Sequence, residues 1–108
     1  DLFLFFSQDL CDDEWTPHPM NPIVSDVRFS RPAGQIAIRD NKLIRPAQDC
    51  SKRYGYAVHL MEIEKIGKTE YRERLVKTFL PNWNHDILGV HTFNQTDGVT
   101  VADALIRR

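Results

Sequence analysis

The chain has 108 residues, which fits one ordinary domain or a piece of one. Hydrophobic residues make up 42% and charged residues 27%, a balance typical of a globular chain rather than a disordered one. Fourteen basic against fifteen acidic side chains give a formal net charge of −1, and the Lys and Arg residues are scattered, so we expect neither nucleic-acid nor membrane-surface binding.

The first predicted element is a strand over residues 2–8, "LFLFFSQ". It is apolar on both faces, which is typical of a strand buried on both sides. The apolar run is much shorter than the ~20 residues of a membrane-spanning helix, so we expect no membrane insertion. Because no Met precedes this strand, we expect the chain to be a piece of something longer.

An acidic loop over residues 9–14 leads into "WTPHPMNPI". The three prolines of this stretch exclude a helix and a central strand, so we predict an extended edge segment with Trp15 packed against the core. Next, "GQIAIRD" and "KLIRPAQD" meet at Asp40-Asn41, a residue pair that favours a tight hairpin turn.

The longest predicted strand, "YGYAVHLMEIEKI", is mostly apolar on both faces, so we expect a layer on each side of it. The stretch "EYRERLVKTFL" follows a turn at Gly67-Lys68 and would also suit a helix by its composition. We predict a strand, because a short turn after a strand makes a meander the simplest connection. Residues 87–108 are typical of a hairpin that turns at Asp97-Gly98.

The predicted fold class is therefore all-β, an antiparallel meander. Middle strands covered on both faces and a more polar fourth strand are typical of the stacked blades of a β-propeller. One full blade with parts of two neighbours would leave sheet edges open, so the remainder of a longer chain or a second copy is expected to complete it. We expect residues 1–108 to form one unit, the C-terminal part of a longer propeller domain.

Two cysteines, Cys11 and Cys50, are too few for a disulfide framework and lack zinc-type spacing. They favour reduced thiols in a cytoplasmic protein. The chain contains no Gly-rich phosphate loop, no Ser-His-Asp order and no set of His and Cys at metal-binding spacing, so we expect no cofactor and no metal.

The strand "KLIRPAQD" carries polar groups that packing alone does not explain. Arg45 and Asp49 share one strand face, while Gln48 points to the other. One interpretation is a structural ion pair between Arg45 and Asp49. The other is a guanidinium and a carboxylate at the rim of a polar cavity, where they would suit sugar hydroxyls, carboxylates or phosphates.

Two further residues are candidates for the same cavity. Arg31, in "SDVRFSRPAG", precedes the innermost strand, and its alternative is a surface position beside an ion pair of Asp26 and Arg28. His91, in "GVHTFN", has the analogous place in the next innermost strand, and its alternative is a satisfied, half-buried histidine. The other three histidines are expected to be structural or superficial: His18, His59 and His85.

Glycoside chemistry uses two carboxylates ~5–9.5 Å apart, one as acid and one as base or nucleophile. Asp97 belongs to a predicted turn. Asp49 and Asp103 remain as candidate catalytic residues.

Three stretches carry a resemblance to a known family: "EWTPHPMNPIVSDVRFSRPAG", "KLIRPAQDCSKRYGYAV" and "GVHTFNQTDGVTVADAL". They resemble the five-bladed propeller domains related to glycoside hydrolases. More narrowly, they are similar to the N-terminal propeller of glucosaminyl inositolphosphorylceramide transferases and to bacterial relatives in polysaccharide and formyltransferase-like proteins.

The resemblance implies a carbohydrate-facing domain with its pocket on the propeller axis. It would bring five residues near that pocket: Arg31, Arg45, Gln48, Asp49 and His91. In the hydrolase relatives one catalytic carboxylate comes from a first blade that this chain lacks, so no complete active site is expected here. Three roles stay open: a hydrolase-like or transferase-associated portion, a non-catalytic module that binds a glycan or glycolipid head group, and purely structural or self-associating blades.

Overall fold

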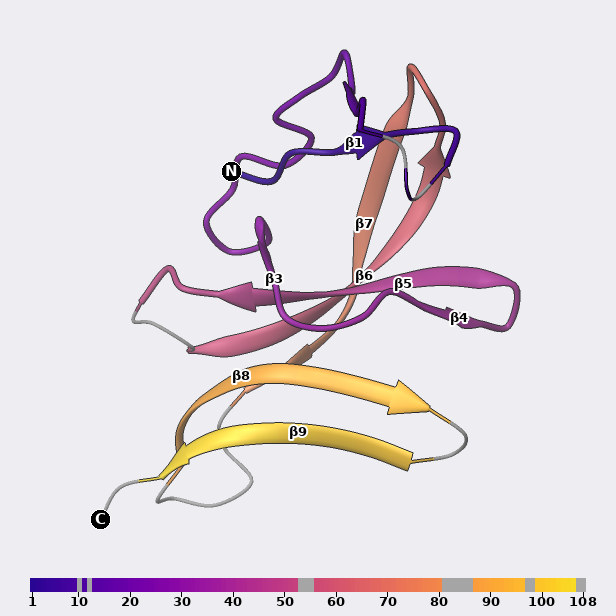
Figure 1. The fold of residues 1–108 in the computed structure, drawn as a ribbon. Coiled ribbons are helices and arrows are strands. Elements are labelled where there is room, and N and C mark those ends of the chain that lie inside the picture. The colour runs from indigo at the N-terminus through magenta and orange to yellow at the C-terminus, as the bar shows by residue number, and fades with distance from the viewer. Residues whose placement is uncertain (10, 12, 53–55, 81–86, 97–98, 107–108) are drawn as a thin grey trace.

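The computed structural model describes residues 1–9, 11, 13–52, 56–80, 87–96 and 99–106, the last two ranges by their backbone. Every regular element in these ranges is a strand, and every pairing is antiparallel (Figure 1), which confirms the predicted all-β meander. The same ranges contain no helix with the length and apolar character needed to cross a membrane. The strands are β1 (Phe5–Phe6), β2 (Thr16–Pro17), β3 (Arg31–Pro32), β4 (Ala37–Arg39), β5 (Lys42–Asp49), β6 (Ala57–Ile66), β7 (Tyr71–Phe79), β8 (Ile87–Thr96) and β9 (Val99–Ile106).

The central sheet has the order β3-β5-β6-β7, and β4 also pairs with β5. Both β3 and β4 run along the same edge of β5, with Arg31 opposite Gln48 and Ala37 opposite Ile44. The innermost strand expected at residues 34–40 is therefore interrupted, and its first part begins earlier, at Arg31.

The hairpin between β4 and β5 has the predicted turn. Asp40 and Asn41 have φ values of 51° and 62°, the left-handed conformation that a two-residue hairpin turn requires at both central positions. Arg39 pairs with Lys42 across it. Asn and Asp tolerate this conformation better than most residues, which explains why the sequence located the turn.

Residues of the fourth predicted strand form β7, so the helical alternative is wrong. The register between β6 and β7 shifts at two places, and at the first of them Leu60 pairs with Lys77 but Met61 pairs with Leu75. The extra residue of this β-bulge is Val76. Because a bulge reverses the alternation of faces, the residues of β7 on either side of it cannot be assigned to one face by sequence parity alone.

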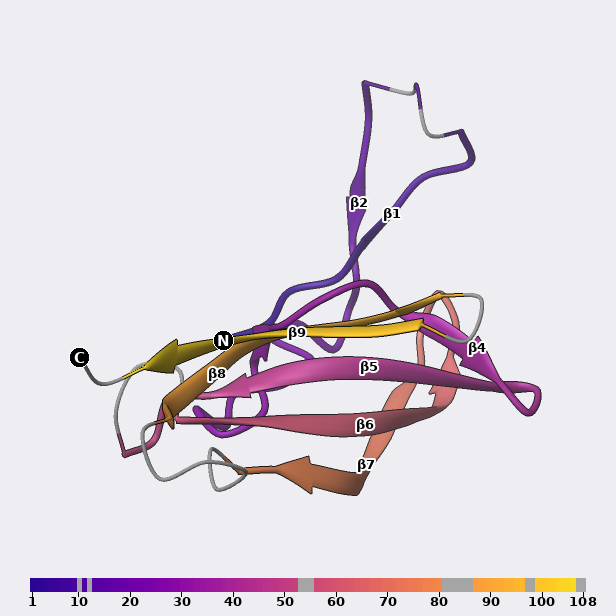
Figure 2. The ribbon, with the colours of Figure 1, turned by 90° about the horizontal axis from the view of Figure 1, so that it is seen from below.

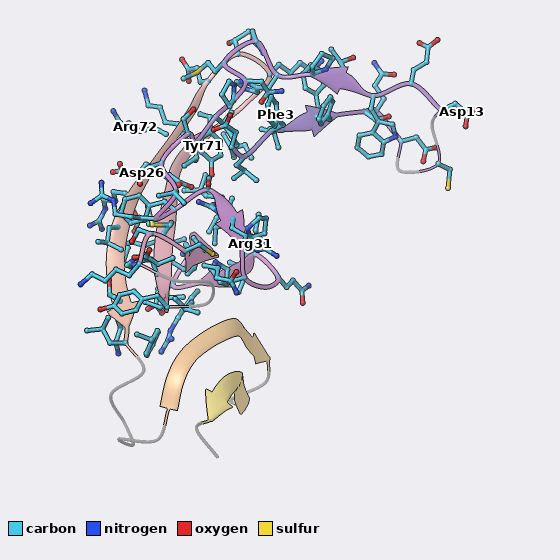
Figure 3. All side chains as sticks on the ribbon, turned by 90° about the vertical axis from the view of Figure 1, so that its left-hand side faces the viewer. Phe3, Asp13, Asp26, Arg31, Tyr71 and Arg72 are labelled. Atoms are coloured by element: carbon cyan, nitrogen blue, oxygen red, sulfur yellow. The ribbon has the colours of Figure 1, made fainter. Side chains whose placement is uncertain are left out.

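The β1–β2 pair and the β8–β9 pair lie on opposite sides of the central sheet (Figures 1 and 3). Phe29, in the segment that leads into β3, places its ring 5.0 Å from that of His59 on β6, and β8 lies beside β5 and β6. The first half of β6 is accordingly buried, with Ala57 and Val58 fully inaccessible. The expectation of a strand covered on both faces is confirmed for this half, whereas residues 64–66 are exposed.

The N-terminal part of the chain departs from prediction. Only Phe5–Phe6 forms a strand of the expected residues 2–8, and it pairs with Thr16–Pro17 in a ribbon that projects from the sheet (Figure 2). Phe3 is 53% exposed and Trp15 46% exposed. The predictions of a strand buried on both sides and of Trp15 packed against the core are therefore wrong, because a projecting two-stranded ribbon has little sheet to pack against.

His18, just after β2, fixes this ribbon to the far end of the sheet. Its Nε2 atom lies 2.8 Å from the carbonyl oxygen of Gly67 and 3.2 Å from that of Glu70, and the amide of Met20 lies 3.1 Å from its Nδ1. An amide can only donate, so Nδ1 accepts and Nε2 carries the hydrogen. The imidazole is 2% exposed, and its expected structural role follows from these three bonds.

Candidate functional site

Arg45 on β5 is buried and reaches across β6 to Glu73 on β7. Its Nε donates to Glu73 Oε2 at 2.9 Å and its Nη2 to Glu73 Oε1 at 2.7 Å, the two-pronged geometry that guanidinium and carboxylate groups prefer. Nη2 also donates to the carbonyl oxygen of Phe29 at 2.6 Å, and the Tyr71 hydroxyl donates to Glu73 Oε2 at 2.6 Å.

The interpretation of an Arg45–Asp49 ion pair is therefore wrong. Four residues along an extended strand span about 13 Å, beyond the reach of the two side chains, whereas the second strand across the sheet is only about 10 Å away. The spacing of residues along β5 gives no information about which residues lie two strands away, on β7. Glu73 is the partner that the sequence reasoning missed.

Burial disfavours the charged form of Arg45, but the hydrogen bonds and charge of Glu73 outweigh this and raise the pKa of the guanidinium above its ordinary value. Burial and the Glu73 carboxylate together raise the pKa of the Tyr71 hydroxyl. One donor stays unsatisfied: Arg45 Nη1 is buried and has no hydrogen-bond partner among the described residues.

Asp49, at the end of β5, is 5% exposed and has both oxygens occupied. Oδ1 accepts from the Ser51 amide at 2.8 Å and from the Ser51 hydroxyl at 2.5 Å, and Oδ2 lies 2.9 Å from His59 Nε2. The other ring nitrogen of His59 lies 2.7 Å from Thr78 Oγ1 on β7. Burial would raise the pKa of Asp49, but the bonds from Ser51 and His59 hold it below its usual range.

These two clusters share one face of the sheet, which we call the polar row: Arg45, Asp49, His59, Tyr71, Glu73 and Thr78. The strand register explains which residues share this face. His59 on β6 lies opposite Ala47 of β5 on one side and opposite Thr78 of β7 on the other. The bulge at Val76 brings Thr78 onto the same face as Glu73. Phe29 covers both clusters, since its carbonyl bonds Arg45 and its ring contacts His59. In Figure 3, Tyr71 points toward the N-terminal segment and Arg72 away from it.

At one end of the sheet the structure brings three of the predicted residues together. Arg31 begins β3 opposite Gln48, and Asp49 follows directly on β5. Gln48 is 3% exposed and points to the face opposite Asp49, as its parity predicted, while Arg31 is exposed. We call these three residues the polar end; Arg45 lies farther along β5.

Near the polar end, Asp26 and Arg28 form the exposed ion pair that their spacing predicted, with Arg28 Nη2 2.5 Å from Asp26 Oδ2. The side-chain hydrogen bond from Arg28, with a backbone bond from the same residue, lowers the pKa of Asp26 to about 2. Because both groups are in water, this pair contributes little to stability.

The backbones of two other candidates are placed, on β8 and β9, but the side chains of His91 and Asp103 lie outside the described part of the chain, as do Asp97 and His85. Within that part, no group of three or more His, Cys, Asp or Glu side chains is arranged to hold a metal ion. Cys11 is exposed and Cys50 half-buried, and both are free thiols, with Cys50 Sγ donating to Gln48 Oε1 at 3.3 Å.

Comparison with known proteins gives a family match over residues 1–94, to the model described as "Glucosamine inositolphosphorylceramide transferase 1, N-terminal". Over 61 residues the chain is 46% identical to a protein of Oryza sativa subsp. indica named glucosamine inositolphosphorylceramide transferase 1. It is 39% identical over 61 residues to the protein of that name from Arabidopsis thaliana. Each alignment covers 55% of this chain and only 8% of the relative. No solved structure matches the chain.

Proposed function

This chain belongs to the family of the N-terminal region of glucosamine inositolphosphorylceramide transferase 1, and from that premise we propose that it is a portion of a carbohydrate-related β-propeller associated with glycosyl transfer. Its part in the reaction is to bind a sugar-containing head group, and the transfer chemistry belongs elsewhere in the protein. The polar end supports this proposal: the exposed guanidinium of Arg31 begins β3 opposite the buried amide of Gln48, and the buried carboxylate of Asp49 follows on the other face of β5.

The propeller part of the proposal is supported by the order of the sheets. A two-stranded ribbon, a five-stranded antiparallel sheet and a second two-stranded pair follow one another along the chain. This is the order expected for the outer strands of one blade, a whole blade and the inner strands of the next. In such an arrangement the beginning of β3 faces the propeller axis, and Arg31 would contribute to an axial pocket together with His91.

The chemistry of the polar end suits sugar hydroxyls. Gln48 shares a sheet face with Arg31 and accepts a hydrogen bond from Cys50, so its amide loses little freedom when a ligand docks, whereas Asp49 lies on the other face. Arg31 supplies donors in a planar fork that can bond two oxygens at once. A catalytic role for Asp49 would need one of its oxygens to leave Ser51 or His59, which is why binding is favoured over chemistry here.

The test is a titration of the purified chain with glucosamine and with myo-inositol, followed by NMR of the backbone amides. We expect saturable shifts with at least one of these probes, and a loss of binding of about tenfold or more in Arg31→Ala, as for a charged hydrogen bond to a ligand. Arg72→Ala is the matched control, since Arg72 is an exposed arginine on β7 with a long contact to Glu64 of 3.5 Å. Equal binding by both variants, or no saturable binding, would contradict the proposal.

A structural role is the second candidate, and the polar row favours it. Arg45 and Glu73 form a two-pronged ion pair without any ligand, so these groups can serve as an internal contact between strands of the sheet. A hydrolase-like role has a separate test: either Asp49→Asn or Asp103→Asn should abolish hydrolysis of an activated glycoside by the whole protein while the fold persists. Turnover that is unchanged in both variants would remove it.

A further inference from the structure

His59 on β6 connects a buried carboxylate to an exposed hydroxyl. Its Nε2 lies 2.9 Å from Asp49 Oδ2 on β5, and its Nδ1 lies 2.7 Å from Thr78 Oγ1 on β7. The imidazole is 7% exposed and Asp49 is 5% exposed, whereas Thr78 is an exposed residue. The three groups therefore form a line that begins inside the sheet and ends at a residue that solvent can reach.

The positions of the hydrogens in this line follow from Asp49. Despite burial, the bonds from Ser51 and His59 keep the pKa of Asp49 below its usual range, so the carboxylate is ionised near neutral pH and can only accept. His59 Nε2 must then carry a hydrogen. In the neutral ring Nδ1 has a free lone pair, and the Thr78 hydroxyl donates to it.

Neighbouring groups hold the carboxylate and the ring in place. Ser51 bonds Asp49 Oδ1 through its amide at 2.8 Å and its hydroxyl at 2.5 Å, which leaves Oδ2 to the imidazole. The Phe29 ring meets the imidazole edge-on, at 61° and with the ring centres 5.0 Å apart. The register of β6 and β7 places His59 directly opposite Thr78. A base fixed in this way can take a proton from the hydroxyl with little rearrangement.

A hydroxyl, an imidazole and a carboxylate in this order are the groups that activate a nucleophile, whichever strands carry them. Asp49 keeps all its bonds in such a scheme and acts as a positioning residue for the ring. In the described sheet, β7 is the last strand of the order β3-β5-β6-β7, so Thr78 can be approached from the sheet edge. The structural alternative is a bond between His59 and Thr78 that only satisfies two polar groups.

We propose that Thr78 is a nucleophilic modification site that accepts an acyl group from an activated carboxylic ester, with His59 as the general base. Thr78 Oγ1 attacks the carbonyl carbon and forms a bond to it, while the hydroxyl proton passes to His59 Nδ1. The bond from that carbon to the leaving oxygen then breaks, and the alcohol leaves with the proton from the imidazole. The product is an ester of Thr78. Sugar binding at the polar end is not needed for this reaction, and Arg31→Ala should leave it unchanged.

The first experiment treats the chain with p-nitrophenyl acetate. We expect a release of about one equivalent of p-nitrophenolate and one acetyl group on Thr78, located by mass spectrometry of tryptic peptides. Hydroxylamine should remove this ester but not the amide of an acetylated lysine, which separates Thr78 from its neighbour Lys77. Thr69, an exposed threonine in the turn between β6 and β7, is the internal control and should stay unlabelled.

Substitutions separate an activated hydroxyl from an ordinary one. Thr78→Val keeps the outline of the side chain and should abolish the labelling, while Thr78→Ser keeps a hydroxyl and should retain it. His59→Gln removes the base and should slow the labelling about a hundredfold, a usual contribution of a positioned general base. Thr69→Val should have no effect.

NMR of the ring nitrogens tests the role of Asp49. In the parent chain, the neutral imidazole of His59 should carry its hydrogen on Nε2 and a bare Nδ1. In Asp49→Asn the new amide can donate to Nε2, which moves the hydrogen to Nδ1, so labelling of Thr78 should fall about tenfold or more.

Three results would each overturn the proposal. They are a Thr78 that is labelled no faster than Thr69, a His59→Gln variant that is labelled at the parent rate, and a parent ring with its hydrogen on Nδ1. The first and the third need no substitution in the buried part of the sheet, so they give an answer even where a core variant does not fold.

Discussion

The two faces of the central sheet use the same kinds of charged groups in opposite ways. In the polar row, Arg45 and Glu73 are 5% and 8% exposed and bond at 2.7–2.9 Å. On the opposite face, Glu62 on β6 accepts from Arg74 and approaches Lys42 at 3.3–3.4 Å, and both cations stay exposed. An ion pair on this sheet is therefore short and buried on the face of the polar row, and longer and open to water on the other face.

Among the variants that test this difference between the two faces, the loss of Glu73 is expected to have the largest effect. Glu73→Ala leaves the buried Arg45 charge without its carboxylate, and we expect the free energy of unfolding to fall by about 3–5 kcal/mol. Glu62→Ala on the other face is the matched control, and a loss of at most about 1 kcal/mol is expected there, because its partners are in water. Urea unfolding of both variants measures the difference. Similar losses would mean that the two faces do not differ in this respect.

Replacing the whole buried cluster should have a much smaller effect than breaking it. The triple variant Arg45→Met, Glu73→Leu and Tyr71→Phe removes the charges and the hydroxyl together, and we expect stability within about 1 kcal/mol of the parent or above it. Thermal unfolding of this variant beside Glu73→Ala gives the answer. A triple variant as unstable as Glu73→Ala would show that the polar row stabilises the fold more than apolar packing could.

The smallest expected effect concerns acid. The pKa of Asp49 is lowered in the folded state, so its contribution to stability is present above the ordinary Asp pKa and is lost as the pH falls through the folded value. The free energy of unfolding should therefore fall less steeply below pH ~4 in Asp49→Asn than in the parent. Asp13→Asn, in the exposed acidic loop, is the control. The same acid dependence in both variants would exclude Asp49 as the source.

Local signals in the sequence predicted much of the central sheet. The Asp40-Asn41 turn and the alternation that separates Arg45 and Asp49 from Gln48 depend on near neighbours in the chain, and both are confirmed. The exposure of Trp15 could not be predicted in this way, because burial depends on which elements dock together.

The partners of the polar groups were the other part that sequence could not supply. Arg45 meets Glu73 two strands away, and Thr78 joins His59 only because a bulge at Val76 reverses the faces of β7. A bulge adds one residue to a strand, and no particular residue type marks its position. The alternation of faces along "EYRERLVKTFL" therefore could not reveal it. Glu73 and Tyr71 are two residues apart and therefore point to the same face of the strand. This was the one signal in the sequence for the position of Glu73.

The hydrogen bonds of His18 have a consequence for the order in which the chain folds. They join residues that are 49 and 52 positions apart, so a large loop must close before the imidazole finds its two carbonyl oxygens. The hairpin of β6 and β7 closes a shorter loop, since even its outermost pair joins Val58 to Phe79, and it can form first. The N-terminal ribbon would then assemble late on a finished template, and its amide protons should exchange with solvent sooner than those of the strands that receive it.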